Sequence, residues 1–517
     1  MTIETSSQRN KRIAKNTLLL YVRMIISMGV SLYTVRIILN TLGVEDYGLY
    51  NVVGGVVALL SFLPGSMASA TQRFFSHALG QKDQKKLNNI FGVNVLIYLG
   101  IGIIALVVLN TGGVWFVENQ LQVPEGRLDA LVSLFYIAVF TFVLTILKAP
   151  FMAIIIAHED MKIYAYMAIV DALLKLGAVF LLIYLPGDKI LVYGLLLLAV
   201  SSIDTFIYLL ICFNKYVECR IQHISWDSGL AKEIVGFTGW TLFGQLTTVA
   251  RGAAITILLN QYFTPVVVAA RAIAVNIAGQ SNLLATQFNT SLYSPIIKAY
   301  AANERKEMIE LVINGSKATF FLMWILALPI FIEMKSILSI WLKNTPNYTV
   351  EFARLTLVEG LIFAVSLPLT TVARAPGKMA AYESILGFFQ FSILAISWFL
   401  FRNNFEPQAT FYVAIIVNLV MFIVRLQIVS RLTGLPVVPY LKQTMLPVFN
   451  VVLISSCLCA LLRYLLPTGL VYFVISLGGI FFITAFTIYY LGLPLEIREK
   501  LTSFVSLKVK NLSNLNR

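Results

Sequence analysis

The stretch NTLLLYVRMIISMGVSLYTVRIILN, residues 16–40, decides the fold class of this chain. Its 25 residues are almost all apolar, and a helix of that length crosses the hydrocarbon core of a bilayer, which is about 30 Å thick. A basic segment at residues 9–15 precedes it, and the acidic pair Glu45 and Asp46 follows. Because the cytoplasmic flanks of membrane spans are enriched in Lys and Arg, we predict a first transmembrane helix that begins in the cytoplasm.

The apolar excess extends over the whole chain. Of its 517 residues, 58% are hydrophobic and 12% are charged, whereas a soluble domain is nearer half apolar and a quarter charged. Segments long enough to span a membrane recur at about 16–40, 49–71, 88–110, 130–157, 163–185, 190–214, 234–261, 265–292, 311–333, 352–373, 380–401, 408–430, 444–466 and 468–493. We therefore predict an all-α polytopic membrane protein with about 14 transmembrane helices.

The positive charges flank the apolar segments rather than forming one polar face. A net charge of +14 is also seen in nucleic-acid-binding proteins, but those gather Lys and Arg on a contiguous surface. Here the basic residues concentrate in alternate loops, as orientation signals do in polytopic membrane proteins. We expect no nucleic-acid partner, and we expect both chain termini on the cytoplasmic side.

A weak internal repeat divides the chain into two halves. VRIILN at residues 35–40 aligns with ITILLN at residues 255–260, an offset of about 220 residues. Six predicted spans separate the two copies, so both run in the same direction, as in transporters built from two parallel bundles. The predicted domains are a first six-helix bundle (1–214), a cytoplasmic connecting loop (215–232), a second six-helix bundle (233–430), and two extra helices with a cytoplasmic tail (431–517).

Small and polar residues form a stripe on one predicted helix of each half. In the segment 265–292, Arg271, Asn282 and Asn289 share a helical face with several alanines. At the same offset the segment 49–71 presents Asn51 among small residues. Such a stripe is common where membrane helices pack closely, but embedded Arg and Asn side chains favour the wall of a hydrated cavity. We predict that these four residues contact substrate.

Several further charges fall inside predicted spans. Asp171 and Lys175 are four residues apart on one helical face, and Asp204 of the next span lies at similar depth. These three residues form either a neutralising intramembrane triad or an ion-coupling site, and the sequence favours neither. Lys317 and Arg425 lie within a turn or two of a predicted helix end, where we expect their side chains to extend to the interface.

Three arginines have no carboxylate nearby in sequence at matching depth. They are Arg23, Arg251 and Arg271, although pairing over a longer range, for instance with Glu359, remains open. Unpaired guanidinium groups in a cavity suit a phosphate or diphosphate, which they bind through two parallel hydrogen bonds. We predict that these arginines bind an anionic substrate.

Sequence patterns of catalysis are absent. The chain has no phosphate-binding loop, nucleophile elbow or HExxH motif, and its four cysteines lack metal-ligand spacing. An integral glycosyltransferase or glycan polymerase would need a large outer loop with paired carboxylates or arginines, which the sequence does not contain. We therefore predict no catalytic residues, no metal, no cofactor and no enzymatic activity. Transport work has to come from an ion gradient, the membrane potential or the substrate gradient.

Two segments resemble a known family. The turn LNTLGVEDYGLYNVV (39–53), with its Leu-Gly followed by Tyr-Gly, and the loop RFFSHALGQKD (73–83) are similar to the early segments of bacterial polysaccharide-export flippases. These belong to the multidrug/oligosaccharidyl-lipid/polysaccharide (MOP) superfamily. The resemblance implies two six-helix bundles in a V shape, in the bacterial inner membrane. It places Arg23 and Arg271 in a cationic central cavity.

The resemblance also implies a substrate and partners. Such flippases move an undecaprenyl-diphosphate-linked oligosaccharide from the cytoplasmic to the outer leaflet by alternating access, for O-antigen or capsule biosynthesis. The implied partners are this lipid-linked glycan, membrane lipids, H⁺ or Na⁺, and polysaccharide polymerase or ligase proteins. The alternative is a cation-coupled multidrug or metabolite exporter of the same superfamily, in which Asp171 or Asp204 binds the ion. That branch usually carries an acidic residue on its first helix, where this chain has arginines.

Overall fold

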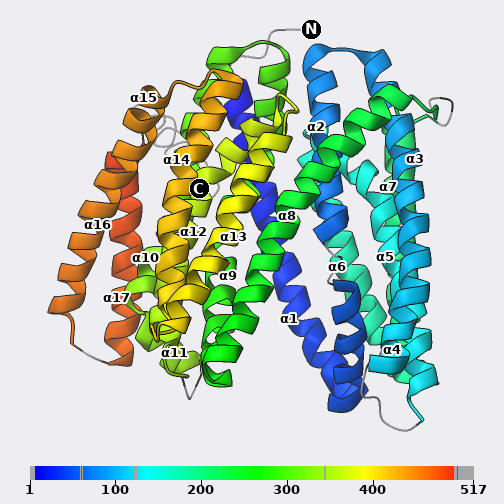
Figure 1. Cartoon of the computed structure of the whole chain (residues 1–517), viewed down its shortest axis with the longest axis horizontal. Coiled ribbons are helices and arrows are strands. Elements are labelled where there is room, and N and C mark those ends of the chain that lie inside the picture. The colour runs from blue at the N-terminus through cyan, green and yellow to red at the C-terminus, as the bar shows by residue number, and fades with distance from the viewer. Residues whose placement is uncertain are drawn as a thin grey trace, which may run out of the picture. The chain divides into compact units, whose positions relative to one another are not determined.

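The computed structural model describes residues 6–58, 60, 62–120, 126–220, 222, 224–342, 345–467, 469–493 and 498. Every regular element in these ranges is a helix, and no strand occurs among them (Figure 1). Thirteen helices are long and apolar enough to cross a membrane. The prediction of an all-α polytopic membrane protein is confirmed. The predicted cytoplasmic tail after residue 493 lies, except for Arg498, outside the described residues.

The helices follow one another with short connections. The first half contains α1 (Ser6–Ala58), α2 (Phe62–Gln81), α3 (Gln84–Val108), a π-helical turn (Leu109–Gly113), α4 (Val114–Gln120), α5 (Leu128–Ala157), α6 (Met161–Tyr184) and α7 (Lys189–Lys215). The second half contains α8 (Ser228–Tyr262), α9 (Pro265–Ala301), α10 (Arg305–Ile332), α11 (Met334–Trp341), α12 (Thr349–Arg374), α13 (Ala380–Arg402), α14 (Ala409–Thr433), α15 (Val437–Tyr440), a π-helical turn (Leu441–Met445), α16 (Leu446–Leu465), α17 (Leu470–Thr487) and a final π-helical turn (Ile488–Gly492).

Capping residues set several helix ends. The side chain of Asp83 accepts a hydrogen bond from the backbone N–H of Lys86 at 2.9 Å, at the start of α3. Asp188 does the same for the N–H of Ile190 at 3.1 Å, at the start of α7. Each cap satisfies a donor that the first turn of a helix leaves free. The α14 helix ends at Gly434, whose φ of 74° is the left-handed conformation that glycine adopts readily.

The second predicted span differs from its prediction. The element α1 consists of two helices that meet at a kink at Gly43, whose φ of 79° and ψ of 172° are not helical, and the second of them begins the second predicted span. The predicted span 49–71 is then interrupted, because α1 ends at Ala58 and α2 begins at Phe62. Pro64 lies in the first turn of α2. Backbone N–H groups in this turn have no acceptor within the helix, so a proline there costs no hydrogen bond. Fourteen spans were expected, and thirteen candidates are found among the described residues; the range 49–71, in which Leu59 and Ser61 lie outside the described residues, is not one of them.

The chain forms two compact units. Unit 1 comprises Met1–Leu246, Thr290–Met308 and Gly377–Glu383, and unit 2 comprises Thr247–Asn289, Ile309–Pro376 and Ser384–Arg517. The predicted connecting loop therefore lies inside unit 1. The division falls within α8, α9, α10 and α13, so each of these four helices contributes residues to both units.

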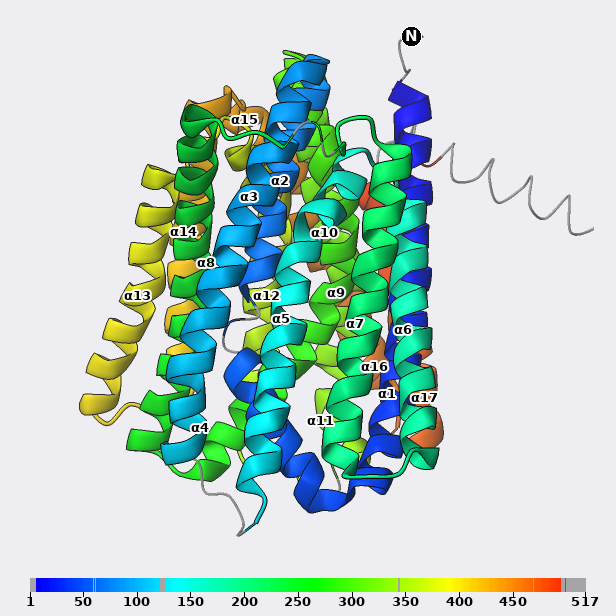
Figure 2. The same cartoon turned by 90° about the vertical axis from the view of Figure 1, so that its right-hand side faces the viewer.

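In unit 1, α5 is the central helix. It packs against α7, α2 and α3, while α1 packs against α6 (Figures 1 and 2). Phe135, Val139 and Ile146 of α5 are completely buried in this core. Apolar residues surround α5 on several sides, which explains why its sequence is apolar all round rather than amphipathic.

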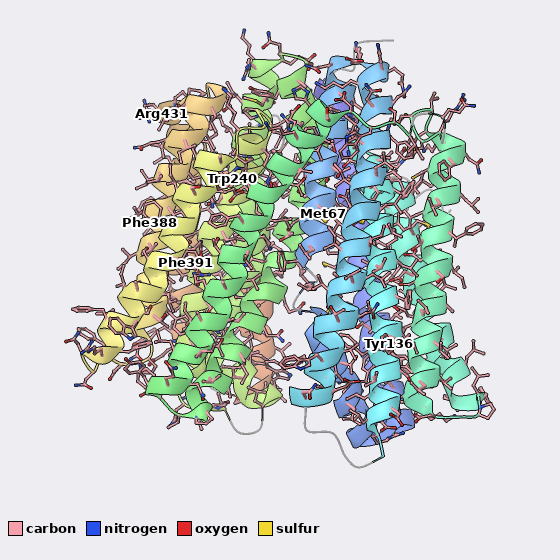
Figure 3. All side chains as sticks on the ribbon, turned by 45° about the vertical axis from the view of Figure 1, so that its right-hand side comes forward. Met67, Tyr136, Trp240, Phe388, Phe391 and Arg431 are labelled. Atoms are coloured by element: carbon pink, nitrogen blue, oxygen red, sulfur yellow. The ribbon has the colours of Figure 1, made fainter. Side chains whose placement is uncertain are left out.

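In unit 2, α12 packs against α14 and α16 packs against α17. Trp324 Nε1 of α10 donates a hydrogen bond to Ser455 Oγ of α16 at 3.1 Å, which attaches the last helices to the rest of the unit. Large apolar side chains also point outward from α13, including Phe388, which is 70% exposed, and Phe391 (Figure 3). Such residues on an outer face are what a helix in contact with lipid requires.

Candidate functional site

Unit 2 contains a pocket of about 540 Å³ between α8, α9, α12, α13 and α14. Small and aliphatic residues form much of its wall. Its charged and amide-bearing lining residues are Arg251, Arg271, Asn282, Glu359, Gln390, Asn418 and Arg425. Three of these helices, α8, α9 and α14, thus bring three guanidinium groups to one cavity.

Arg251 is paired with a carboxylate. Its Nη1 lies 2.9 Å from Glu359 Oε1, and Asn418 Nδ2 donates to the same oxygen at 3.0 Å. The side chains of Arg251 and Glu359 are 18% and 20% exposed. The long-range pairing with Glu359 that the sequence left open is therefore present, so Arg251 is not an unpaired cation. The physical reason is that a charge away from water needs a partner, which a helix distant in sequence supplies here.

Arg271 makes a different set of contacts. Its Nη1 donates to Thr256 Oγ1, and its Nη2 donates to the backbone oxygen of Gly252 at 3.2 Å. Both acceptors are neutral and lie one turn apart on α8. Among the described residues, Arg271 has no carboxylate within ion-pair distance, so its charge remains available to the pocket.

Arg425 lies where the sequence did not place it. We expected Arg425 and Lys317 to extend toward the interface, but Arg425 lines the pocket and Lys317 is only 8% exposed. Arg425 Nε is buried and has no hydrogen-bond partner among the described residues. A signal existed in the sequence: Arg425 follows Asn418 by seven residues, which places both side chains on one face of α14.

The three predicted asparagines have different environments. Asn282 lines the pocket of unit 2, and its Nδ2 donates to the oxygen of Ala278 at 3.2 Å. Asn289 is bonded to Thr371 Oγ1 at 3.3 Å and is not among the residues of that pocket. Asn51, in unit 1, is exposed and donates to the backbone oxygen of Tyr47 at 2.7 Å. Of these three, Asn282 remains in the candidate site.

Arg23 belongs to unit 1. Its guanidinium carbon lies 4.4 Å from the centre of the Tyr164 ring on α6, which is cation–π geometry. Its Nη1 is buried without a hydrogen-bond partner among the described residues. Arg251 and Arg271 therefore share one pocket, whereas Arg23 has an aromatic environment of its own.

The predicted triad of α6 and α7 is divided between two ion pairs. Lys175 Nζ lies 2.8 Å from Asp171 Oδ2, as their spacing of four residues allows. Asp204, whose side chain is 2% exposed, instead binds Lys148 Nζ of α5 at 2.5 Å. Depth in the membrane was the basis for grouping Asp204 with Lys175. The side of the helix on which each residue lies brings Asp204 to Lys148 instead.

Lys148 also lines a second pocket, of about 520 Å³, in unit 1. The wall comes from α1, α2, α5 and α7 and is mostly apolar, with Tyr50, Thr141 and Thr145 among its few polar residues. Among the described residues of this lining, Lys148 is the one that carries a charge, and Asp204 neutralises it. This pocket is nearly neutral.

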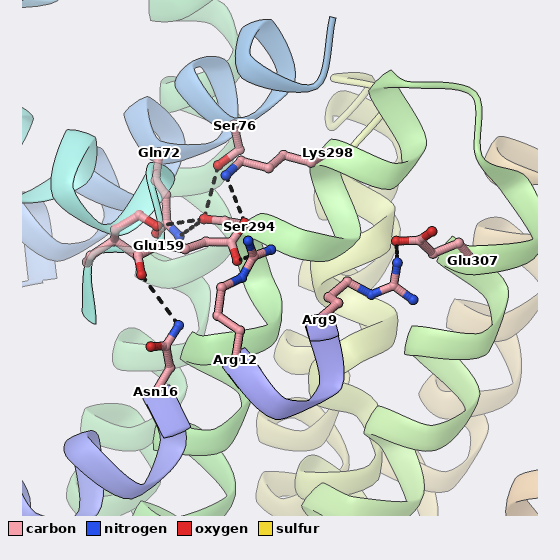
Figure 4. A network of polar contacts seen from close by, with 10 residues as sticks. Arg9, Arg12, Asn16, Gln72, Ser76, Glu159, Ser294, Lys298 and Glu307 are labelled. Carbon is pink, nitrogen blue, oxygen red and sulfur yellow. Dashed lines mark hydrogen bonds and ion pairs between the residues drawn. The ribbon is translucent and has the colours of Figure 1, made fainter. Parts of the chain in front are cut away.

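A polar network lies at the end of unit 1 that carries the amino terminus (Figure 4). Glu159, whose side chain is 3% exposed, connects α5 to α6 with a φ of 64°. Its Oε2 lies 2.9 Å from Arg12 Nη2, and its Oε1 lies 2.8 Å from Lys298 Nζ of α9. Its backbone oxygen accepts a hydrogen bond from Asn16 Nδ2 at 3.4 Å. One buried carboxylate therefore holds two cations from opposite ends of the unit's sequence.

Ser294 of α9 is the second centre of this network. Its Oγ accepts hydrogen bonds from Gln72 Nε2 and Ser76 Oγ, each at 3.1 Å, and donates to the oxygen of Ile156 at 2.9 Å (Figure 4). The helices α2 and α9 are close together beside it. A Cβ atom on Gly80 would lie 2.7 Å from the backbone oxygen of Lys298. The carboxyl-terminal part of α9 is thus fixed to unit 1 by hydrogen bonds as well as charge.

The neighbouring residues of the same turn bind the end of α7. His158 Nε2 lies 2.5 Å from Glu218 Oε1, and Asp160 Oδ2 contacts both Lys215 Nζ at 2.9 Å and the hydroxyl of Tyr216 at 2.6 Å. Burial acts to raise the pKa of Glu218, but hydrogen bonds from His158 and from the backbone outweigh it, so that pKa lies below its ordinary value.

Comparison with known sequences identifies a family. The family described as "Polysaccharide biosynthesis protein" matches residues 13–301. The uncharacterized membrane protein EpsK of Bacillus subtilis (strain 168) is 25% identical over 232 residues, which are 43% of this chain and 44% of that protein. The match thus spans less than half the length of this relative.

Comparison with solved structures identifies the fold. A MATE protein in the straight conformation gives a TM-score of 0.71 at 13% identity, covering 83% of this chain and 97% of the other. An outward-facing multidrug resistance MATE family transporter of the MOP superfamily gives 0.71 at 14% identity, covering 84% and 99%. A MOP superfamily transporter from Pyrococcus furiosus, described as having a reverse polarity of its binding pocket, gives 0.64 at 15%, covering 82% and 96%.

Proposed function

The chain belongs to the polysaccharide biosynthesis protein family, and from that premise we propose that it is a flippase for a lipid-linked glycan. The proposed substrate is an oligosaccharide joined through a diphosphate to a polyprenyl lipid such as undecaprenol. The protein moves it by alternating access from the cytoplasmic to the outer leaflet of the bacterial inner membrane. The proposed product serves cell-surface polysaccharide assembly by separate polymerase or ligase proteins.

The observation that carries this proposal is the arginine-lined pocket of unit 2. Arg271 has only neutral acceptors among its described contacts, and Arg425 presents a buried Nε without a partner there. Guanidinium groups bind phosphoryl oxygens through paired hydrogen bonds whose strength increases away from water. The pocket therefore suits an anion better than the cationic compounds that drug exporters carry.

The size of the pocket supports the same substrate. A volume of about 540 Å³ lies within the range of small-molecule sites. In our proposal it takes the diphosphate and the adjacent sugar, while the remaining sugars and the lipid chain lie outside it. Asn282 and Gln390 supply amide groups for sugar hydroxyls.

The test is complementation of a bacterial strain that lacks its own glycan flippase. With matched membrane levels, we expect the wild-type chain to restore surface glycan and Arg271→Ala to lose it, with lipid-linked glycan accumulating inside. Arg431→Ala, at the exposed end of α14, is the matched control and retains export. Full export by Arg271→Ala would contradict the proposal.

A second candidate function is a cation-coupled exporter. The observation that favours it is the buried Asp204–Lys148 pair beside the apolar pocket of unit 1, since an apolar cavity next to a titratable carboxylate suits lipophilic cations. This function predicts that Asp204→Asn abolishes dye efflux while Arg271→Ala does not. Raised dye resistance from the wild-type chain, without surface glycan, would select it over the flippase.

A further inference from the structure

We propose that unit 2 carries a separate binding site for the headgroup of a zwitterionic membrane phospholipid, one that joins a phosphate to a primary ammonium as phosphatidylethanolamine does. The site is a pocket of about 240 Å³ between the α10–α11 junction and the α16–α17 connection. It shares no lining residue with the arginine-lined pocket. The inference therefore does not depend on the proposed flippase function.

The pocket lies at the level of the membrane interface. It is formed where α10 is followed by α11 and where α16 is connected to α17, and Figure 1 shows α11 and this connection at the same end of unit 2. Trp341, Tyr464 and Tyr472 are exposed there. Trp and Tyr concentrate at the depth of the lipid headgroups. In the predicted topology this end of the helices is the outer one.

The short helix α11 has the two faces of a helix that lies along a membrane surface. Met334 and Leu338 are completely buried, whereas Ile340 and Trp341 are more than half exposed. An exposed apolar face of this kind contacts the boundary between headgroups and acyl chains. Ile340 also lines the pocket, together with Leu470 of α17. A phospholipid whose headgroup enters the pocket can therefore keep its acyl chains against an apolar rim.

A buried ion pair forms part of the wall. Glu333, whose side chain is 2% exposed, lies 2.8 Å from Arg463 Nε through its Oε1. Ser476 Oγ donates to the same oxygen at 2.6 Å, and Ser336 Oγ donates to Oε2 at 2.9 Å. Among the described lining residues, Glu333 and Arg463 are the ones that carry a charge. The lining is thus neutral overall but has two fixed charges, which is the charge pattern of a zwitterion.

Arg463 retains a donor for the phosphate. Its Nε binds Glu333, and its Nη1 donates to the backbone oxygen of Leu466 at 3.2 Å. Its Nη2 makes no hydrogen bond in the part of the chain that the structure describes, and the side chain is 32% exposed. Guanidinium groups form short, charge-assisted hydrogen bonds with phosphate oxygens. Arg463 Nη2 is therefore the group that binds the lipid phosphate.

Ser336 and Ser339 supply acceptors for the ammonium. Each hydroxyl already donates its proton, Ser336 to Glu333 and Ser339 to the backbone oxygen of Ser336 at 2.8 Å. Because a hydroxyl has one donor and two acceptor lone pairs, both lining oxygens are left as acceptors. A primary ammonium carries three donors, whereas the trimethylammonium of phosphatidylcholine carries none. The two serines therefore favour the primary amine.

The size and the charge of the pocket exclude other ligands. Its volume of about 240 Å³ is below the usual range of small-molecule sites, about 300–1,000 Å³, so it takes a headgroup rather than an oligosaccharide. An anionic phospholipid such as phosphatidylglycerol leaves one negative charge without compensation, because Glu333 already neutralises Arg463. It also leaves the serine acceptors without a charged donor.

The test measures lipid binding to the purified full-length protein by native mass spectrometry. The probes are the dioleoyl forms of phosphatidylethanolamine, phosphatidylcholine and phosphatidylglycerol. The double variant Ser336→Ala/Ser339→Ala removes both acceptors and keeps the ion pair, and Ser339→Leu, at an exposed position, fills the pocket. Ser202→Ala is the matched control, because Ser202 is an exposed serine of α7 whose hydroxyl also donates to a backbone oxygen.

We expect the wild type and Ser202→Ala to bind phosphatidylethanolamine at least tenfold more tightly than either of the other two lipids. The double variant loses this preference, and Ser339→Leu binds phosphatidylethanolamine at least tenfold more weakly. Thermal unfolding confirms that each variant is folded, and either variant alone tests the inference. A wild type that binds the three lipids alike, or that prefers phosphatidylglycerol, overturns the inference. An unchanged preference in both serine variants overturns it as well, and neither result bears on the flippase.

Discussion

The two units each contain a pocket of similar volume but of opposite character. In unit 1 the pocket of about 520 Å³ is mostly apolar, and Lys148, the one described residue of its lining that carries a charge, is neutralised by Asp204. In unit 2 the pocket of about 540 Å³ holds three arginines and one glutamate. The predicted repeat pairs helices of the two pockets, since spans two, four and six line the first and spans eight, ten and twelve contribute to the second. One scaffold thus accommodates a neutral cavity and a cationic one.

The difference comes from single positions on helices that the predicted repeat pairs with each other. Asp204 of α7 and Arg425 of α14 are separated by about the repeat offset of 220 residues, and they carry opposite charges. In unit 1 the carboxylate cancels a lysine. In unit 2 the guanidinium adds to two other arginines. The comparison teaches that the polarity of such a pocket is determined by how far its charges cancel, and less by the helices that surround it.

The largest effect should come from breaking the neutral pair of unit 1. Lys148→Ala leaves the carboxylate of Asp204, which is 2% exposed, without a partner, and removing one member of a buried pair costs about 3 to 5 kcal/mol. We expect a strong fall in the unfolding temperature of the detergent-purified protein. The double variant Lys148→Met/Asp204→Leu should recover most of it. A single variant as stable as the wild type would show that the pair is not structural.

A smaller effect is expected from the corresponding change in unit 2. Arg251→Ala removes the partner of Glu359, but that carboxylate is 20% exposed to the pocket and keeps its hydrogen bond from Asn418. We expect a loss of about 1 to 3 kcal/mol, the cost of a polar group left unpaired. Thermal unfolding of Arg251→Ala and Lys148→Ala under the same conditions shows which variant loses more stability. If Arg251→Ala were the more destabilising variant, the pocket of unit 2 would be a structural core rather than an open site.

The smallest effect concerns pH at the polar end of unit 1. The folded pKa of Glu218 lies below its ordinary value of 4.5, so the ionised form is the one that folding stabilises. Its contribution is complete above that ordinary value and disappears as pH falls through the lower folded value. The unfolding temperature of the wild type should exceed that of Glu218→Gln at pH 6, and the difference should shrink as the pH falls below the ordinary value of 4.5. A difference that grows on acidification would reverse the assigned shift.

The fold could be predicted from the sequence further than the site could. The length and apolar composition of a segment such as 16–40 can be read directly from the sequence, and these two properties are enough to predict a membrane helix. The break after Ala58 could not be predicted, because the residues on both sides of it are apolar. The sequence could name Glu359 as a long-range partner of Arg251 but could not establish the pair, because the two residues are 108 positions apart and their contact depends on how two helices are rotated.

The prediction for Arg425 failed for a related reason. Counting residues from the end of a span gives depth, and depth suggested that the side chain extends to the interface. The environment of Arg425 depends instead on which side of α14 it lies. Asn418, seven residues earlier, is on the same side of the helix, and both residues line the pocket. Asp204 was misassigned in the same way, with depth favouring Lys175 and direction selecting Lys148.

The shared carboxylate of Glu159 also has a consequence for the order in which the protein is made. Its two cations, Arg12 and Lys298, are 286 residues apart in the chain, which a ribosome needs roughly 15 to 60 s to synthesise. During that interval the first six helices can be inserted, but Glu159 has only Arg12, and Gln72 and Ser76 lack Ser294. A fragment that ends before α9 therefore lacks one of the two cations of Glu159 and the hydroxyl that binds Gln72 and Ser76.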